Sequence, residues 1–151
     1  MKRKSIIQLF SICAALIFVL LTSGCVGPTV RTYNGDKLQK SEVAVIKGWN
    51  YFAVFGYDCI DIYRIDGSSL KARNVEVLPG WHELEIRWYN FNFVEPLGLP
   101  PRYAEVKLNF EAGHEYKIMA LFKGILQEGV KIIDVTTGAI ILSQPWQNWY
   151  K

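Results

Sequence analysis

Two histidines occur in the chain of 151 residues, and both stand in the same local pattern. Each follows a glycine and leads into an alternating run, in GWHELEI for His82 and in GHEYKI for His114. If the two runs lie side by side as strands, the imidazoles approach one another and could hold a metal ion. A third ligand would then be needed, for which the available side chains are Asp58, Cys59 and Asp61. A small-ligand or metal-binding role for His82 and His114 is therefore one hypothesis.

The spacing of the two histidines favours a structural role instead. About thirty residues separate the two His-Glu pairs, which matches no recognised spacing of metal ligands. A histidine at the edge of a core that bonds a turn carbonyl explains the pattern without a metal. The sequence shows no serine or cysteine in a nucleophile-like context, no glycine-rich phosphate loop and no paired carboxylate motif. We therefore expect no catalytic residues, no cofactor and no enzymatic activity.

The N-terminal residues predict an export signal that ends at a cysteine. A basic start precedes an apolar run from Ile6 to Leu21, and the leader closes with LTSGC. This ending resembles the lipobox of bacterial lipoproteins, in which small residues precede a cysteine that is acylated and becomes the new N-terminus. The matching residue is Cys25, although Thr22 departs from the leucine most common at its position. An uncleaved spanning helix and a soluble secreted protein with an incidental cysteine are the alternatives.

Acylation of Cys25 would make a membrane the first partner of this protein. Each buried methylene of an acyl chain contributes about 0.8 kcal/mol, so two or three chains hold a protein on a bilayer without a spanning helix. In lipoproteins an aspartate after the cysteine often means retention in the inner membrane, and here the residue is Val26. In a bacterium with two membranes, the resemblance implies the outer membrane, with the protein facing the periplasm.

Removal of the leader changes both the charge and the cysteine count. It takes three of the 17 Lys and Arg residues and none of the 14 Asp and Glu, so the mature chain carries 14 of each and no formal net charge. Binding to nucleic-acid phosphates needs a clustered basic surface, and the mature sequence shows no such cluster. A nucleic-acid partner is therefore not expected. Cys13 leaves with the leader and Cys25 is committed to lipid. We expect the remaining cysteine, Cys59, to be buried as a small apolar residue rather than to form an intermolecular disulfide.

Four segments are predicted along the chain: a signal peptide over 1–24, an acylated N-terminus and flexible tether over 25–41, a β domain over 42–143 and an aromatic tail over 144–151. From Glu42 onward, short runs rich in Val, Ile and aromatic residues are bounded by Gly, Pro, Asn and Asp, which is typical of strands. About eight short strands joined by short turns predict an all-β domain, an antiparallel β-sandwich or partly open barrel.

Alternation within two of these runs predicts which side chains form the core. His82 shares a face with the apolar positions of WHELEIRW, and the run RYAEVKLNF alternates in the same way. Beyond Trp88 the apolar residues change to the other face, which predicts a bulge or bend between Trp88 and Phe91. The residues predicted to lie in the core are Leu84, Ile86, Val106 and Leu108.

The two histidine stretches also carry a family resemblance. The stretch from Pro79 to Ile86, followed later by AGHEY, is similar to small β-sandwich domains of bacterial surface lipoproteins, including PEGA-like domains. The resemblance spans roughly residues 58–122, and the chain departs from it in the inserted stretch NFVEPLGLPPR. It implies a compact envelope domain that displays or binds something and brings no catalytic residues.

Two segments outside the alternating pattern are candidate interaction surfaces. The proline-rich loop carries Leu97 and Leu99, and the tail carries Trp146, Trp149 and Tyr150. Tryptophan and tyrosine are favoured at protein interfaces and at membrane–water boundaries. The tail would instead be structural if it folded back as a lid over the sandwich, and sugar stacking is a third possibility. The sequence thus predicts a membrane-anchored lipoprotein with a non-enzymatic binding or envelope-structural role, whose partner is an envelope protein or a polysaccharide.

Overall fold

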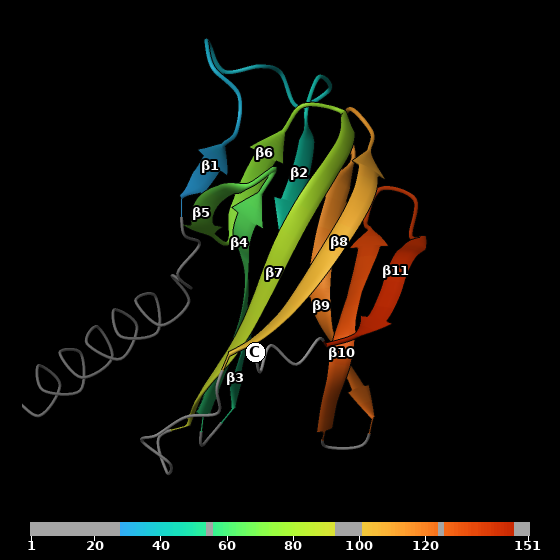
Figure 1. Cartoon of the computed structure of the whole chain (residues 1–151). Helices are drawn as coiled ribbons and strands as arrows, with labels where there is room; N and C mark the ends of the chain where they lie inside the picture. The colour runs from blue at the N-terminus through green and yellow to red at the C-terminus, as the bar shows by residue number, and fades with distance from the viewer. Residues whose placement is uncertain (1–27, 54–55, 93–100, 124–125, 147–151) are drawn as a thin grey trace, which may run out of the picture.

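The computed structural model describes residues 28–53, 56–92, 101–123 and 126–146, and these residues form an all-β structure without a helix (Figure 1). The all-β class predicted from the sequence is confirmed. The strands are β1 (Thr29–Arg31), β2 (Ala44–Lys47), β3 (Trp49–Ala53), β4 (Gly56–Ile65), β5 (Ser68–Ala72), β6 (Asn74–Val77), β7 (Gly80–Asn92), β8 (Arg102–Phe110), β9 (Glu115–Lys123), β10 (Leu126–Asp134) and β11 (Ile140–Pro145).

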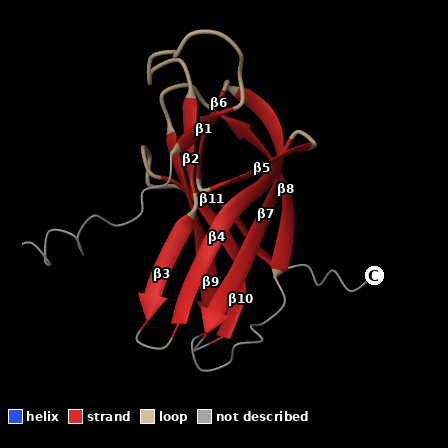
Figure 2. Ribbon diagram, turned by 90° about the vertical axis from the view of Figure 1, so that its left-hand side faces the viewer, coloured by secondary structure: helices blue, strands red, loops and turns tan. Residues whose placement is uncertain are grey.

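The strands form two sheets that face one another as a sandwich (Figures 1 and 2). One sheet has the order β1-β6-β2-β9-β10-β11, and the other has the order β3-β4-β7-β8 with β5 also paired to β4. Most neighbours are antiparallel, but β1 pairs parallel with β6 and β2 pairs parallel with β9. The described residues contain eleven strands, more than the eight or so that the sequence predicts, and β1 lies within the predicted tether.

The core lies between the inner faces of the two sheets. The predicted core residues Leu84, Ile86 and Val106 are buried, and Leu108 is partly buried against the same cluster. Leu84 pairs with Val106 in the register of β7 and β8, so both contribute to one layer of the core. The period of two therefore identified the inner face of these strands correctly.

The bulge predicted between Trp88 and Phe91 is absent from the described part of β7, and a bulge occurs in β4 instead. Pairing of β7 with β4 continues residue for residue from Trp88 to Asn92. The register shifts between Ile62 and Arg64, where β4 has one residue more than β7. The extra residue is Tyr63, and the bulge keeps the next apolar residues of β4 on the inner face.

The structure also differs from the predicted tether over residues 25–41. Thr29 to Arg31 pair with β6, and the Thr32 N–H donates to the carbonyl of Glu76 at 3.1 Å. The strand is short and polar, so the sequence carried no periodic signal for it. In the described residues no helix is long and apolar enough to cross a membrane. The predicted signal helix lies outside those residues.

Candidate functional site

His82 lies at the start of β7 with both ring nitrogens facing hydrogen-bond acceptors. Nδ1 lies 2.6 Å from Oδ2 of Asp66, and Nε2 lies 2.8 Å from the carbonyl oxygen of Leu78. Burial acts to raise the pKa of Asp66, but hydrogen bonds from the His82 ring and the Glu83 N–H hold it below the ordinary value. His82 thus bonds a turn carbonyl at the edge of the core.

His114 repeats this arrangement in the other sheet. Its Nδ1 donates to Oδ2 of Asp134 at 2.8 Å, and Asp134 also accepts from the backbone N–H groups of Thr136 and Thr137. Burial acts to raise the pKa of Asp134, but these hydrogen bonds outweigh it and the pKa lies below its ordinary value. The pair therefore ties the start of β9 to the turn after β10.

The two histidines do not meet, because two aromatic rings separate them. The ring centroid of His82 lies 6.1 Å from that of Phe110, which lies 4.8 Å from that of Tyr116. The Tyr116 ring stacks on His114 at 6.2 Å. Among the residues that the structure describes, no group of three or more His, Cys, Asp or Glu side chains could hold a metal ion. The geometry gives the metal hypothesis no support.

The three candidate third ligands also have other partners. Cys59 is 1% exposed and its Sγ accepts a hydrogen bond from Nη2 of Arg73 at 3.6 Å. Its predicted burial is confirmed. Asp61 binds Arg87 with two hydrogen bonds, and Asp58 lies on the same strand. These side chains therefore belong to the packing of β4.

One of the predicted interaction residues lies in the core. Trp146 is 8% exposed, its ring centroid lies 6.4 Å from that of Trp88, and its backbone N–H donates to the carbonyl of Glu128. Trp146 therefore packs into the sandwich, but the start of the tail does not fold back: Gln144 and Pro145 belong to β11, and Trp146 extends the pairing of β11 with β10. The other predicted contact or lipidation residues lie outside the described part of the chain: Cys25, Leu97, Leu99, Trp149 and Tyr150.

A cluster of tyrosines and cations covers the outer face of β4 and β7. The guanidinium carbons of Arg87 and Arg64 lie 4.9 and 5.5 Å from the Tyr63 ring centroid, and Nζ of Lys71 lies 5.8 Å from it. Arg87 also lies 5.1 Å from the centroid of Tyr89. Such contacts are favourable because the ring face is negative. We call Tyr63, Lys71, Arg87 and Tyr89 the tyrosine–cation face.

Asp61 holds Arg87 in place beneath these rings. Nη2 and Nε of Arg87 donate to the Asp61 carboxylate at 2.6 and 3.2 Å, and the Asp61 residue is only 6% exposed. The hydrogen bond to Asp61 raises the pKa of Arg87 above its ordinary value, although burial opposes this. Arg87 is therefore a permanent and rigidly placed cation.

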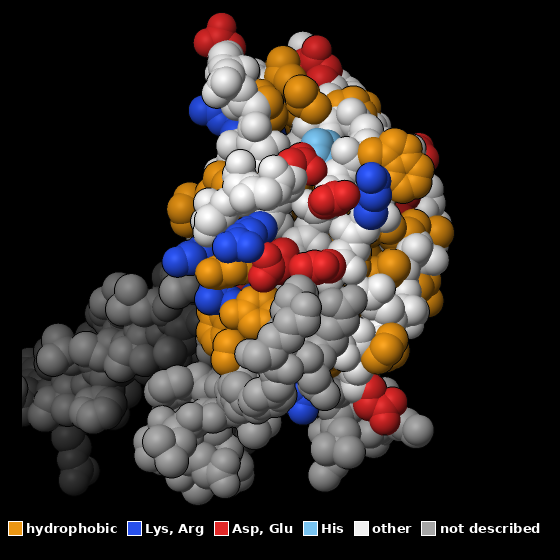
Figure 3. Space-filling view, in the orientation of Figure 1, with side chains coloured by type: hydrophobic (Ala, Val, Ile, Leu, Met, Phe, Trp, Pro, Cys, Tyr) orange, Lys and Arg blue, Asp and Glu red, His pale blue; other side chains and the backbone are white. Residues whose placement is uncertain are grey.

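A hollow of about 270 Å³ opens at the side of the tyrosine–cation face that lies nearest to β1. In Figure 3, basic side chains gather toward the side where β1 and β5 lie, and acidic side chains lie closer to the middle of the face. We call this space the β1-side hollow. Its lining residues are Pro28, Val30, Asp61, Lys71, Ala72, Arg73 and Tyr89.

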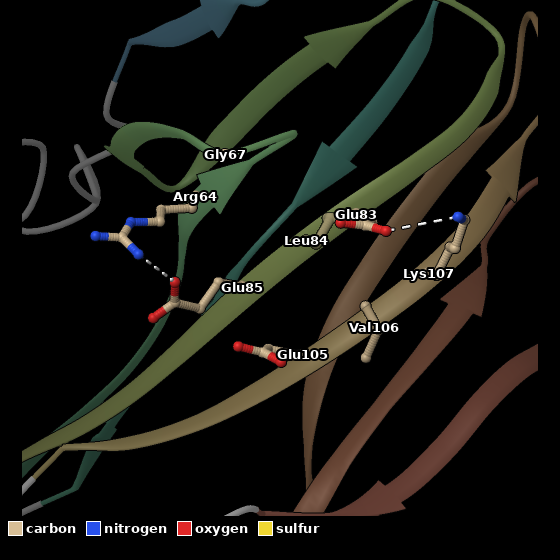
Figure 4. Close-up of a pocket in the computed structure, with 8 residues that line it drawn as sticks. All are labelled: Arg64, Gly67, Glu83, Leu84, Glu85, Glu105, Val106 and Lys107. Atoms are coloured by element: carbon tan, nitrogen blue, oxygen red, sulfur yellow. Dashed lines mark ion pairs between the residues drawn. The ribbon is translucent and has the colours of Figure 1, made fainter. Parts of the chain in front are cut away.

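A second hollow of about 400 Å³ lies on the outer face of β7 and β8 and is crossed by ion pairs (Figure 4). Nη1 of Arg64 lies 3.4 Å from Oε2 of Glu85, and Nζ of Lys107 lies 3.5 Å from Oε1 of Glu83. Glu85 lies directly opposite Glu105 in the register, an arrangement of like charges that is unfavourable across two strands. The Arg64 charge offsets this repulsion.

Sequence reasoning did not identify the tyrosine–cation face. Its members come from three strands, and only the fold brings them together: Tyr63 from β4, Lys71 from β5, and Arg87 and Tyr89 from β7. One signal was available, because Ile62 and Ile65 are three residues apart rather than two. That spacing indicates an extra residue in the strand, and the extra residue is Tyr63.

Comparison of the chain with protein-family models, with curated proteins and with solved structures gave no match. The functional conclusion therefore rests on the geometry of the described residues and on the N-terminal sequence.

Proposed function

We propose that this chain is a lipoprotein of the bacterial cell envelope, held on the membrane by acyl chains on Cys25, and that its β-sandwich domain has a non-enzymatic binding or structural role. The leader, with its basic start, apolar run and LTSGC ending, supports the anchor. Val26 favours the outer membrane, with the domain in the periplasm. The PEGA-like resemblance supports a domain that displays or binds something.

The tyrosine–cation face is the observation that carries the binding role. Tyr and Arg are enriched at protein contact surfaces, because they offer large area and charge-assisted bonding. Here the face is also preorganised, since Arg87 is fixed by Asp61 and the rings of Tyr63 and Tyr89 lie over its guanidinium. A rigid surface loses little side-chain entropy when it meets a partner.

The anchor is tested by changing Cys25→Ser in the full chain. The parent should partition into detergent and accumulate as a longer precursor when the lipoprotein signal peptidase is inhibited. The variant should lose the acyl mass and no longer respond to the inhibitor. Unchanged mass and unchanged membrane association in the variant would contradict acylation and favour an uncleaved helix.

The binding role is tested by lysine footprinting of the same protein in isolated envelopes and after solubilisation in detergent. Lys71 lies on the tyrosine–cation face, and Lys117 is an exposed lysine on β9 in the other sheet, which serves as the control. We expect acetylation of Lys71, but not of Lys117, to be slower in the envelope. Equal reactivity of Lys71 in both states would show that nothing covers this face.

A further inference from the structure

We infer that the partner of the tyrosine–cation face is the membrane surface itself, through the anionic headgroups of the lipids around the anchor. This inference rests on the proposed acylation of Cys25. It assigns to Lys71 and the neighbouring tyrosines the role of orienting the domain on the bilayer, in addition to the acyl chains that hold it there.

The length of chain between the anchor and the domain sets the first constraint. Thr29, the first residue of β1, is four residues after Cys25. Four extended residues span at most about 14 Å. β1 is fixed to β6 over three paired residues, so this short connection is joined directly to the sheet. An acylated Cys25 therefore keeps the β1 side of the sandwich at the membrane surface.

The β1-side hollow places the tyrosine–cation face next to this attachment point. Pro28 and Val30 line the same hollow as Lys71 and Tyr89. Pro28 is three residues from Cys25 in the sequence. The β11 strand is the other edge of the six-stranded sheet and lies farthest from β1 in the strand order. The face that lies closest to the lipid is therefore the one that carries the cations and tyrosines.

The chemistry of this face suits an anionic headgroup layer. Asp61 is neutralised by Arg87, and among the described residues Lys71 makes no ion pair with a carboxylate. The Lys71 side chain is exposed, and the residue has a φ of +49° in a bulge of β5 that brings Nζ over the Tyr63 ring. Tyrosine is favoured at the membrane interface because its ring is apolar and its hydroxyl is polar. Lysine is attracted to the negative surface potential of anionic lipids.

The test uses the full-length acylated protein, purified in detergent and reconstituted into vesicles. One set of vesicles contains phosphatidylglycerol and the other only phosphatidylcholine, and both carry a headgroup-labelled acceptor lipid. A fluorophore is attached through Ser69→Cys on β5 or, as the control, through Ser143→Cys on β11, both exposed positions. Cys59 is 1% exposed and does not compete for the label. Mass spectrometry of the N-terminal peptide verifies acylation in each sample.

We expect stronger energy transfer from the Ser69→Cys label than from the Ser143→Cys label in anionic vesicles, and a loss of that difference at high salt. Lys71→Gln should shift the ratio of docked to undocked protein about fivefold toward the undocked state. Lys117→Gln should leave the ratio unchanged. Lysine and glutamine place similar demands on the backbone at position 71, so the comparison isolates the charge.

The outcomes separate this inference from the proposed function. Equal transfer from both labels, or transfer that is independent of lipid charge and of Lys71, would overturn membrane docking. If the acyl mass on Cys25 is still detected in those samples, the proposed anchor is unaffected. Protection of Lys71 in native envelopes without docking on vesicles would also overturn it and would assign the face to a protein or polysaccharide. Absence of the acyl mass would remove the anchor and, with it, the constraint on which docking depends.

Discussion

Asp61 and Arg87 lie directly opposite one another on β4 and β7 and are joined by two hydrogen bonds, with Nη2 to Oδ2 at 2.6 Å and Nε to Oδ1 at 3.2 Å. The pair lies beneath the rings of Tyr63 and Tyr89. Either charge would be poorly solvated without the other. The tyrosine–cation face and the stability of the β4–β7 pairing therefore depend on the same contact.

We expect Arg87→Ala to lower the free energy of unfolding by about 3 kcal/mol, because it leaves the Asp61 carboxylate buried and unpaired. The matched control is Arg64→Ala, which removes a cation from an ion pair in which the Arg64 side chain is 51% exposed. An exposed pair contributes about 1 kcal/mol or less. Urea titrations followed by circular dichroism measure both values. Equal losses in the two variants would show that the Asp61–Arg87 pair has no special role.

Asp134 should contribute to acid unfolding. Its pKa in the folded protein lies below the ordinary value of 3.8, so its stabilisation is present above that value and is lost as the pH falls through the folded pKa. Asp134→Asn should lower stability at pH 7 by about 2 kcal/mol, because the charge-assisted bond to His114 is lost. Below about pH 4 the variant should lose less stability with falling pH than the parent. Urea titrations at a series of pH values measure this. If the free energy of unfolding falls equally steeply with pH in parent and variant, the prediction is refuted.

Trp146 should behave as a core residue. Trp146→Ala is expected to cost about 3 to 5 kcal/mol, the usual range for a buried aromatic ring. Trp146→Phe should cost much less, since it keeps a ring and removes an indole N–H that has no acceptor within the described residues. Trp81→Ala is the surface control, because Trp81 is 67% exposed. A Trp146→Ala variant as stable as the parent would mean that this ring does not contribute to the core.

Gly129 should not tolerate a side chain. A Cβ at this position would collide with the carbonyl oxygen of Gln144 on β11, a backbone atom that cannot move aside without breaking the β10–β11 pairing. We expect Gly129→Ala to cost at least about 2 kcal/mol. Gly138→Asn is the control, because Gly138 has a φ of +77° in open space and asparagine adopts that region readily. Thermal unfolding of the two variants compares them directly.

The sequence was most informative where one strand face is buried. In β7 and β8 the period of two places Leu84, Ile86 and Val106 inside, and the hydrophobic core enforces that choice along both strands. His82 was placed correctly at the head of the inner face for the same reason. Its partner Asp66 was not predictable, because the contact joins residues that are close only after β4 and β7 have paired.

Elements that are held by backbone hydrogen bonds, rather than by buried apolar side chains, could not be predicted from the sequence. β1 is exposed at two of its three positions, so it has no apolar period, and its place in the sheet depends on backbone hydrogen bonds to β6. The bulge was expected near Trp88 because the apolar side appeared to change there. It lies at Tyr63, where a register shift in β4 restores the inward direction of Ile65. Local alternation reports which face is apolar, but register is decided by both partner strands.

The position of β1 has a mechanical consequence. A pull on the N-terminal end of the described chain loads the three-residue pairing of β1 with β6 first, before any strand whose side chains fill the core. Release of β1 would free residues 29–41, which extend to on the order of 45 Å. The remaining ten described strands would keep their pairing. Under tension, β1 would thus detach first and lengthen the connection while the sandwich stays folded.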